Sequence, residues 1–323
     1  MSHHHSHGHS GCGHAHSGHG SHGHGHTHGA CHDHGHGHGH CEDAPATPGI
    51  LLALFGTTVE AARTGYDSFE RTVRERFPGI PVHRAYTANK VRRKMASQGA
   101  PQALSVAQAL TEMHDQGITH VAVQSVQVIP GVEYEFMART AKAMEYPGKG
   151  FRKVMVGSPL ITNRMLRHVA LGIPRYIPAG LEPDDAVVLV AHGSFHEAQA
   201  NLLALQAELA LCSPRTVVGA LMGTGLELPD VMRRLKSLNA KRVHIVPFMC
   251  VAGFHYLHDV AGNGPDSWAS VIAAHGWESV CHPLAAVACK QFADIWLYNL
   301  HVALLHLGEE SRKLVPPLPK HHH

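Results

Sequence analysis

The sequence lacks the features that mark several large classes of protein. No apolar stretch approaches the roughly 18 residues needed to cross a bilayer, and the first residues show neither the basic nor the apolar part of a signal peptide. We therefore expect no membrane association and a cytoplasmic location. Neither a Gly-x-x-x-x-Gly-Lys phosphate loop nor a Gly-x-Gly-x-x-Gly fingerprint occurs, so no organic cofactor is expected.

A strong charge of one sign and closely paired cysteines are also missing. The 27 Lys and Arg residues nearly balance the 25 Asp and Glu residues, and this even balance argues against a nucleic-acid partner. The 7 cysteines include no Cys-x-x-Cys pair. Neither a disulfide framework nor a structural zinc site is therefore indicated.

Histidine is abundant, and it is concentrated near the amino terminus. Of the 33 histidines, 17 lie between His3 and His40, where they alternate with Gly and Ser and almost no apolar side chain. Such a segment cannot offset the entropy lost on ordering. Residues 1–47 are therefore predicted to be a disordered tail whose imidazoles bind divalent metal ions.

From residue 48 onward the composition is that of a globular protein. Apolar runs that end in Gly-rich turns alternate with segments of helical periodicity, which is typical of parallel strands joined by crossover helices. The predicted fold class is α/β, with two similar domains that each contain a parallel sheet of about four strands flanked by helices. Because residues 174–185 are rich in Pro and Gly, the predicted domains are residues 48–180 and 181–315.

The two predicted domains look like copies of each other. Buried strands are predicted at residues 50–55 and 186–191, and each leads into a Gly-containing turn and a helix. Longer apolar runs at residues 121–129 and 243–251 each lead into a segment with Gly and an aromatic residue. The pattern indicates an internal repeat.

Superposing the two copies places the unusual residues at matching positions. Phe55 falls opposite His192, and Glu133 falls opposite His255, each at the carboxyl end of a strand where open parallel sheets bind ligands. Taken singly, each has an ordinary structural explanation, such as a satisfied histidine or a helix-capping glutamate. If the halves face each other, however, Glu133, His192 and His255 meet in one cleft, as an open ligand set for a first-row divalent ion.

Several motifs at these strand ends are found together in one enzyme family. They are Ala53-Leu54-Phe55-Gly56-Thr57, Ile129-Pro130-Gly131-Val132-Glu133-Tyr134, Ala191-His192-Gly193-Ser194 and Val251-Ala252-Gly253-Phe254-His255. With them, residues 49–302 resemble the sirohydrochlorin cobaltochelatases of the anaerobic cobalamin pathway, which are class II chelatases. The resemblance implies an ATP-independent enzyme (a lyase) that inserts Co²⁺ into sirohydrochlorin and releases two protons.

The resemblance also implies roles for individual residues. The family's metal-binding histidines fall on His192 and His255, and its Gly-x-Glu-Tyr glutamate falls on Glu133, so these three are the predicted catalytic and metal-binding residues. A second family glutamate is missing, and Glu227 could replace it through a shifted loop. Gln127 stands where the family often has a histidine. Both departures leave Ni²⁺ or Fe²⁺ open as the substrate metal.

Sirohydrochlorin carries eight carboxylates, so its binding site needs cationic or amide groups at the rim and apolar groups against the ring. A solvated helix face is the ordinary explanation for a cluster of basic residues. The predicted substrate-binding residues are Phe55, Arg63, Arg92, Arg93 and Phe254, with Lys90 and Lys94 in the same basic cluster.

Other functions stay open at this point. A metal storage or delivery protein would use the tail as its working part, although it would not need paired site motifs in both halves. An acyl hydrolase built on Ser194 would require a Gly-x-Ser-x-Gly turn, which is missing. The residue that accepts a pyrrole proton, and whether the chain forms a homo-oligomer, are not determined by the sequence.

Overall fold

The computed structural model describes residues 45–99 and 103–317. The prediction of a disordered, metal-binding tail concerns residues 1–47, and residues 1–44 lie outside this range. Within the described ranges, no helix is long and apolar enough to cross a membrane.

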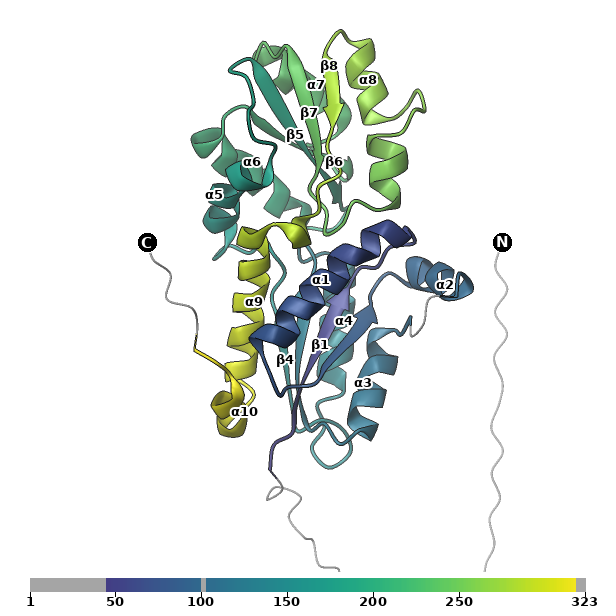
Figure 1. Cartoon of the computed structure of the whole chain (residues 1–323), viewed down its shortest axis with the longest axis vertical. Coiled ribbons are helices and arrows are strands. Elements are labelled where there is room, and N and C mark those ends of the chain that lie inside the picture. Colours follow the sequence, from purple (N-terminus) through teal and green to yellow (C-terminus); the bar gives the residue numbers. More distant parts are fainter. Residues whose placement is uncertain (1–44, 100–102, 318–323) are drawn as a thin grey trace, which may run out of the picture. The chain divides into compact units, whose positions relative to one another are not determined.

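Two four-stranded sheets, shown in Figure 1, confirm the predicted α/β class. All strand pairs are parallel, and the orders β2-β1-β3-β4 and β6-β5-β7-β8 are the same arrangement used twice, as the repeat predicts. The strands are β1 (Pro48–Leu54), β2 (Val82–Tyr86), β3 (His120–Val126), β4 (Lys153–Gly157), β5 (Asp185–Gly193), β6 (Thr216–Met222), β7 (Arg242–Pro247) and β8 (Glu278–Cys281).

Helices cover both sheets, and every residue of β1 is buried, as expected for a parallel strand that is enclosed on both faces. The α-helices are α1 (Glu60–Arg76), α2 (Asn89–Ser97), α3 (Val106–Asp115), α4 (Val132–Ala143), α5 (Leu166–Tyr176), α6 (Gln199–Cys212), α7 (Leu228–Ser237), α8 (Trp268–Ala274), α9 (Lys290–Leu305) and α10 (Glu309–Leu314). Two short helical turns, η1 (Tyr256–Val260) and η2 (Ala286–Ala288), complete the described elements.

Two strands are shorter than the sequence predicts. The predicted strands at 121–129 and 243–251 end at Val126 and Pro247, and the following residues form loops instead. In both loops the backbone carbonyls bond to a later segment of the same half rather than to a neighbouring strand. In the first half, Gln127 and Val128 accept from the N–H groups of Leu160 and Ile161; in the second, Met249 and Cys250 accept from those of Ala286 and Val287 in η2. The identical departure in both halves is further support for the repeat.

The helices that follow each sheet are exchanged between the halves. Helix α5 packs against α6 of the second half, whereas α9 runs beside β3 and β4 of the first (Figure 1). Each helix forms a hydrogen bond to the end of a central strand in the other half. Trp296 Nε1 of α9 donates to the carbonyl of Gln127 after β3, and the Tyr176 hydroxyl of α5 donates to that of Pro247 in β7. The domain boundary at residue 180 stays a prediction; it separates the two sheets but not the helices that cover them.

Trp296 is fully buried and packs edge-on against Phe69, with 5.9 Å between the ring centroids. Trp296→Ala should therefore lower the free energy of unfolding by about 3–5 kcal/mol, measured by chemical denaturation. Tyr298 lies on the same helix and is 38% exposed, so Tyr298→Ala is the matched control and should cost clearly less. Equal losses in the two variants would contradict the packing role of Trp296.

Candidate active site

A cavity of about 460 Å³ lies where the carboxyl ends of strands from both sheets meet. This is the position at which open parallel sheets bind their ligands. The strand-end residues predicted from the repeat all line it, namely Phe55 after β1, Glu133 after β3, His192 at the end of β5 and His255 after β7. The structure thus brings together the four residues that the superposition of the two halves singled out.

His192 is held by the turn that follows it. Its Nδ1 lies 3.1 Å from the carbonyl oxygen of Gly193, which can only accept a hydrogen bond, so Nδ1 carries the ring proton. Gly193 has a φ of 75°, and a Cβ there would lie 1.9 Å from the backbone oxygen of Met222. Only glycine fits this turn, and the turn engages Nδ1 of His192 while leaving its Nε2 available.

His255 is oriented by a carboxylate one helical turn away. Its Nδ1 lies 2.6 Å from Oδ2 of Asp259, so here too Nδ1 carries the proton and Nε2 is left to bind. Metal-binding histidines are commonly held by a carboxylate or carbonyl at the other nitrogen. The ring centroids of His192 and His255 are 4.8 Å apart. The two imidazoles are therefore neighbours, and each has its Nδ1 engaged by an oxygen acceptor.

Glu133 lies in the first turn of α4, where the helix dipole favours a carboxylate. It lines the same cavity and contributes a favourable charge to protonated His192. Its carboxylate and the ligand nitrogens of the two imidazoles do not all lie within 4.8 Å of one another, so the three do not form a compact set of donor atoms. Elsewhere in the described ranges, one set of three side chains does meet this distance. Glu133 thus lines the same cavity but does not lie in close contact with the two histidines.

Burial is the main influence on the charge of His192. Removal from water, followed by the nearby imidazole of His255, holds the pKa of His192 below its ordinary value, while the Gly193 carbonyl and Glu133 oppose the shift. The ring is therefore neutral near pH 7 and can bind a metal. Cys250 also lines the cavity, and burial raises the pKa of its thiol to about 12, so the thiol is neutral in the metal-free protein.

Aromatic side chains flank the two histidines. Phe55 lies 5.9 Å from His192 between ring centroids, and the ring of Phe254 lies 5.9 Å from that of His255. Phe254 is 46% exposed, and the ammonium of Lys94 sits 5.7 Å from its ring centroid. Lys94 and Phe254 come from different halves and both line the cavity, so this cation–π contact joins the two halves beside it.

The predicted arginines do not line the cavity, whereas two lysines of the same cluster do. On α2, Lys90 and Lys94 are four residues apart and share the face that meets the cavity. The side chain of Arg92 lies against α3 instead, bonding to the carbonyl of Ala103 and to Gln108. Two further arginines are likewise absent from the lining: Arg63, whose Nε donates to the carbonyl of Thr57, and the exposed Arg93.

Glu227 is not brought to the histidines. The chain folds back at the end of β6, with the N–H of Ala220 bonded to the carbonyl of Leu226, and Glu227 is the N-cap residue immediately before α7. It lines neither the main cavity nor a second hollow of about 380 Å³ that also contacts His192 and His255. The missing family glutamate is therefore not replaced by Glu227 in this arrangement.

Gln127, which stands where a histidine was expected, is buried, and its amide donates to the Thr87 hydroxyl at 3.0 Å. Sequence reasoning missed Asp259, which lines the second hollow together with Asp266. The His-x-x-x-Asp spacing of His255 and Asp259 on a helical turn is a signal that could have found it.

Comparison with known proteins identifies the family. The model of the cobalt chelatase (CbiK) family matches residues 48–305, and the chain belongs to that family of metal chelatases. It is 35% identical to the sirohydrochlorin cobaltochelatase CbiKC of Nitratidesulfovibrio vulgaris, over 81% of this chain and 92% of that protein. It is 26% identical to the sirohydrochlorin cobaltochelatase of Salmonella typhimurium, over 81% of this chain and 98% of the relative. The predicted family and enzyme class are confirmed.

Solved structures share the fold at low sequence identity. SirB from Bacillus subtilis with Fe³⁺ superposes with a TM-score of 0.56 at 15% identity, covering 80% of this chain and 95% of that one. The sirohydrochlorin chelatase SirB from Bacillus subtilis subspecies spizizenii in complex with cobalt gives 0.52 at 14% identity, with the same coverage. These likenesses show the two-sheet chelatase fold.

The lowered pKa of His192 predicts how its ring titrates. In the metal-free protein, we expect the His192 signal in a proton NMR titration to change with a midpoint below the ordinary value of about 6.5. Because the folded pKa is below the unfolded one, the unfolded chain binds more protons between the two values, and this group lowers stability as pH falls below about 6.5. The signal is assigned by its loss in His192→Ala. His255→Asn should move the midpoint upward, and a midpoint above 6.5 would contradict the prediction.

Proposed function

We propose that the protein is a sirohydrochlorin cobaltochelatase, which inserts Co²⁺ into sirohydrochlorin without ATP and releases two protons. The observation that carries this proposal is the pair His192 and His255, with both Nε2 atoms free, in a cavity between the sheets of a cobalt chelatase fold. The names of its relatives support the same reaction for the same tetrapyrrole. A cytoplasmic location is part of the proposal.

The metal is a substrate, and the two imidazoles are its proposed ligands. Imidazole binds cobalt, nickel and iron, and a pair of ring nitrogens leaves further positions for water and for the tetrapyrrole nitrogens. As the tetrapyrrole nitrogens bind the metal, two pyrrole N–H bonds break and both protons leave the macrocycle. Glu133 is the remaining negative group of the cavity lining, so it either completes the metal set or accepts one of these protons.

The remaining cavity lining suits the macrocycle. Phe55 and Phe254 offer ring faces near the histidines, and Lys90 and Lys94 supply positive charge toward the carboxylates of the substrate. The lining is otherwise mostly apolar, as in ligand pockets that bury a large organic molecule. These four residues are the proposed substrate contacts.

The decisive experiment is an absorbance assay of the purified protein with sirohydrochlorin and Co²⁺, Ni²⁺ or Fe²⁺ in turn. Insertion should be fastest with Co²⁺, and His192→Ala or His255→Ala should reduce it by at least about a hundredfold, because each removes a metal ligand. Both variants should keep the wild-type circular dichroism spectrum, since both rings face the cavity. Near-wild-type turnover in either variant would remove that histidine from the site.

Glu133→Gln keeps the shape of the side chain and removes its charge. If Glu133 completes the metal set, the KM for Co²⁺ rises more than the KM for sirohydrochlorin. If it accepts a proton, kcat falls and both KM values stay close to those of the wild type.

The lysines of α2 should govern tetrapyrrole binding. We expect the double variant Lys90→Glu/Lys94→Glu to raise the KM for sirohydrochlorin at least about tenfold, because a repulsive charge replaces an attractive one beside the cavity. Arg92→Glu/Arg93→Glu is the matched control, since it makes the same change of charge on the same helix without altering the lining. A larger effect in the arginine variant would reverse this assignment.

The tail is proposed to supply metal. A flexible chain of about 40 residues has a root-mean-square reach of roughly 35 Å, and ions tethered to it would be concentrated near the body of the protein. Deletion of residues 1–43 should slow insertion when free Co²⁺ is scarce and change little when it is abundant. Equal rates at limiting Co²⁺ and neutral pH would point to storage or detoxification as the role of the tail.

A further inference from the structure

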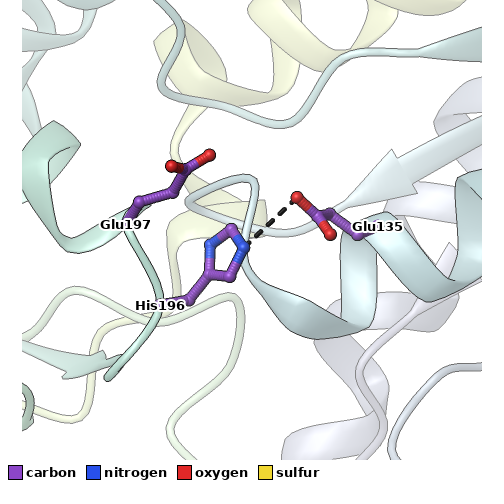
Figure 2. Close-up of side chains that lie close together, drawn as sticks. All are labelled: Glu135, His196 and Glu197. Carbon is purple, nitrogen blue, oxygen red and sulfur yellow. Dashed lines mark ion pairs between the residues drawn. The ribbon is translucent and has the colours of Figure 1, made fainter.

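A second group of side chains that could hold a metal ion lies outside the set described so far. Glu135, His196 and Glu197 each offer a ligand atom, and these atoms all lie within 4.8 Å of one another. Figure 2 shows Glu135 reaching out from α4 toward the loop between β5 and α6, which carries the other two. His196 Nε2 is 3.2 Å from Glu135 Oε1. We refer to these three residues as the outer group.

The outer group is carried by two of the three chain segments that form the proposed insertion site. Glu135 follows Glu133 by two residues, and His196 follows His192 by four. Between them, Ser194 lines the cavity, and its hydroxyl accepts a hydrogen bond of 3.0 Å from the N–H of His196. The outer group is therefore next to the cavity and joins the two halves of the protein there.

The charges of the outer group call for a cation. Glu197 is exposed, and its carboxylate has no ion-pair or hydrogen-bond partner among the described residues. Glu135 pairs with His196 and, at 3.4 Å, with Arg139, whose side chain is itself 82% exposed. Two carboxylates this close repel each other unless a cation lies between them, and a solvated arginine at the edge offsets only part of that repulsion.

We propose that Glu135, His196 and Glu197 form an outer site for a first-row divalent cation. One imidazole and two carboxylates suit such an ion, and the exposed side leaves positions for water and for exchange. A further step, which rests on the proposed function, is that the ion passes from this outer site to His192 and His255.

The protonation of the rings gives this transfer a direction. Nδ1 of His196 accepts a hydrogen bond from the N–H of Ala198 at 3.2 Å, so its Nε2 carries the proton in the metal-free protein. Binding a metal at Nε2 moves that proton to Nδ1 and breaks the bond to Ala198. In His192 and His255 the proton already lies on Nδ1. The outer site should thus bind more weakly than the inner pair, which is the order that inward transfer requires.

Crystals of the full chain equilibrated with CoCl₂ test the outer site directly. Anomalous scattering at the cobalt edge gives the position of each ordered ion, so ions at the outer site are distinguished from any bound by the tail. We expect one peak between Glu135, His196 and Glu197 and a second at His192 and His255. Glu135→Gln/Glu197→Gln should lose only the outer peak. Glu60→Gln, an equally conservative change of an exposed glutamate on α1, should keep both.

The outcomes separate this proposal from the proposed function. No outer peak at Co²⁺ concentrations far above those that fill the inner pair, or an outer peak that persists in Glu135→Gln/Glu197→Gln, overturns the outer site. An outer peak without an inner one supports the outer site and counts against His192 and His255 as the insertion ligands. An outer peak that fills at lower Co²⁺ concentration than the inner one contradicts the direction of transfer.

Discussion

The proposed chemistry depends on holding the carboxyl ends of two parallel sheets against each other, and a reciprocal exchange of helices does this. Trp296 of α9 bonds to the carbonyl of Gln127 at the end of β3, and Tyr176 of α5 bonds to that of Pro247 at the end of β7. Each bond joins a helix of one half to a strand end of the other. Because both anchors are buried aromatic side chains, their hydrogen bonds are shielded from water and the strand ends keep their positions.

Within this frame the proposed site combines an apolar cavity with a small number of fixed polar groups. Burial lowers the pKa of His192 and so keeps the ring in its metal-binding form. The Gly193 carbonyl fixes a proton on Nδ1 of His192, and the Asp259 carboxylate does the same for His255. The outer His196 instead carries its proton on Nε2. In the proposed scheme, this difference makes the inner histidines the tighter ligands and His196 the weaker, exchangeable one.

Much of the fold could be predicted because its signals are local. Apolar runs, Gly-rich turns and helical periodicity repeat along the chain, and matching the two copies placed Phe55, Glu133, His192 and His255 at strand ends. The boundaries of β3 and β7 were wrong, since apolar residues beyond Val126 and Pro247 line a cavity and pack against loops instead of continuing a strand. Periodicity alone does not distinguish these two uses of an apolar residue.

The sequence by itself determined the class of fold, the internal repeat and the positions of His192 and His255 at strand ends. It could do so because strands and the turns that end them follow from neighbouring positions in the chain. Only the tertiary structure decided that Lys90 and Lys94 rather than Arg92 and Arg93 meet the cavity, since this depends on how α2 is rotated against the second half. The exchange of α5 and α9 likewise rests on contacts across 71 and 169 residues. Glu135 meets His196 for the same reason: two segments that are separate in the chain come together only when the two sheets face each other.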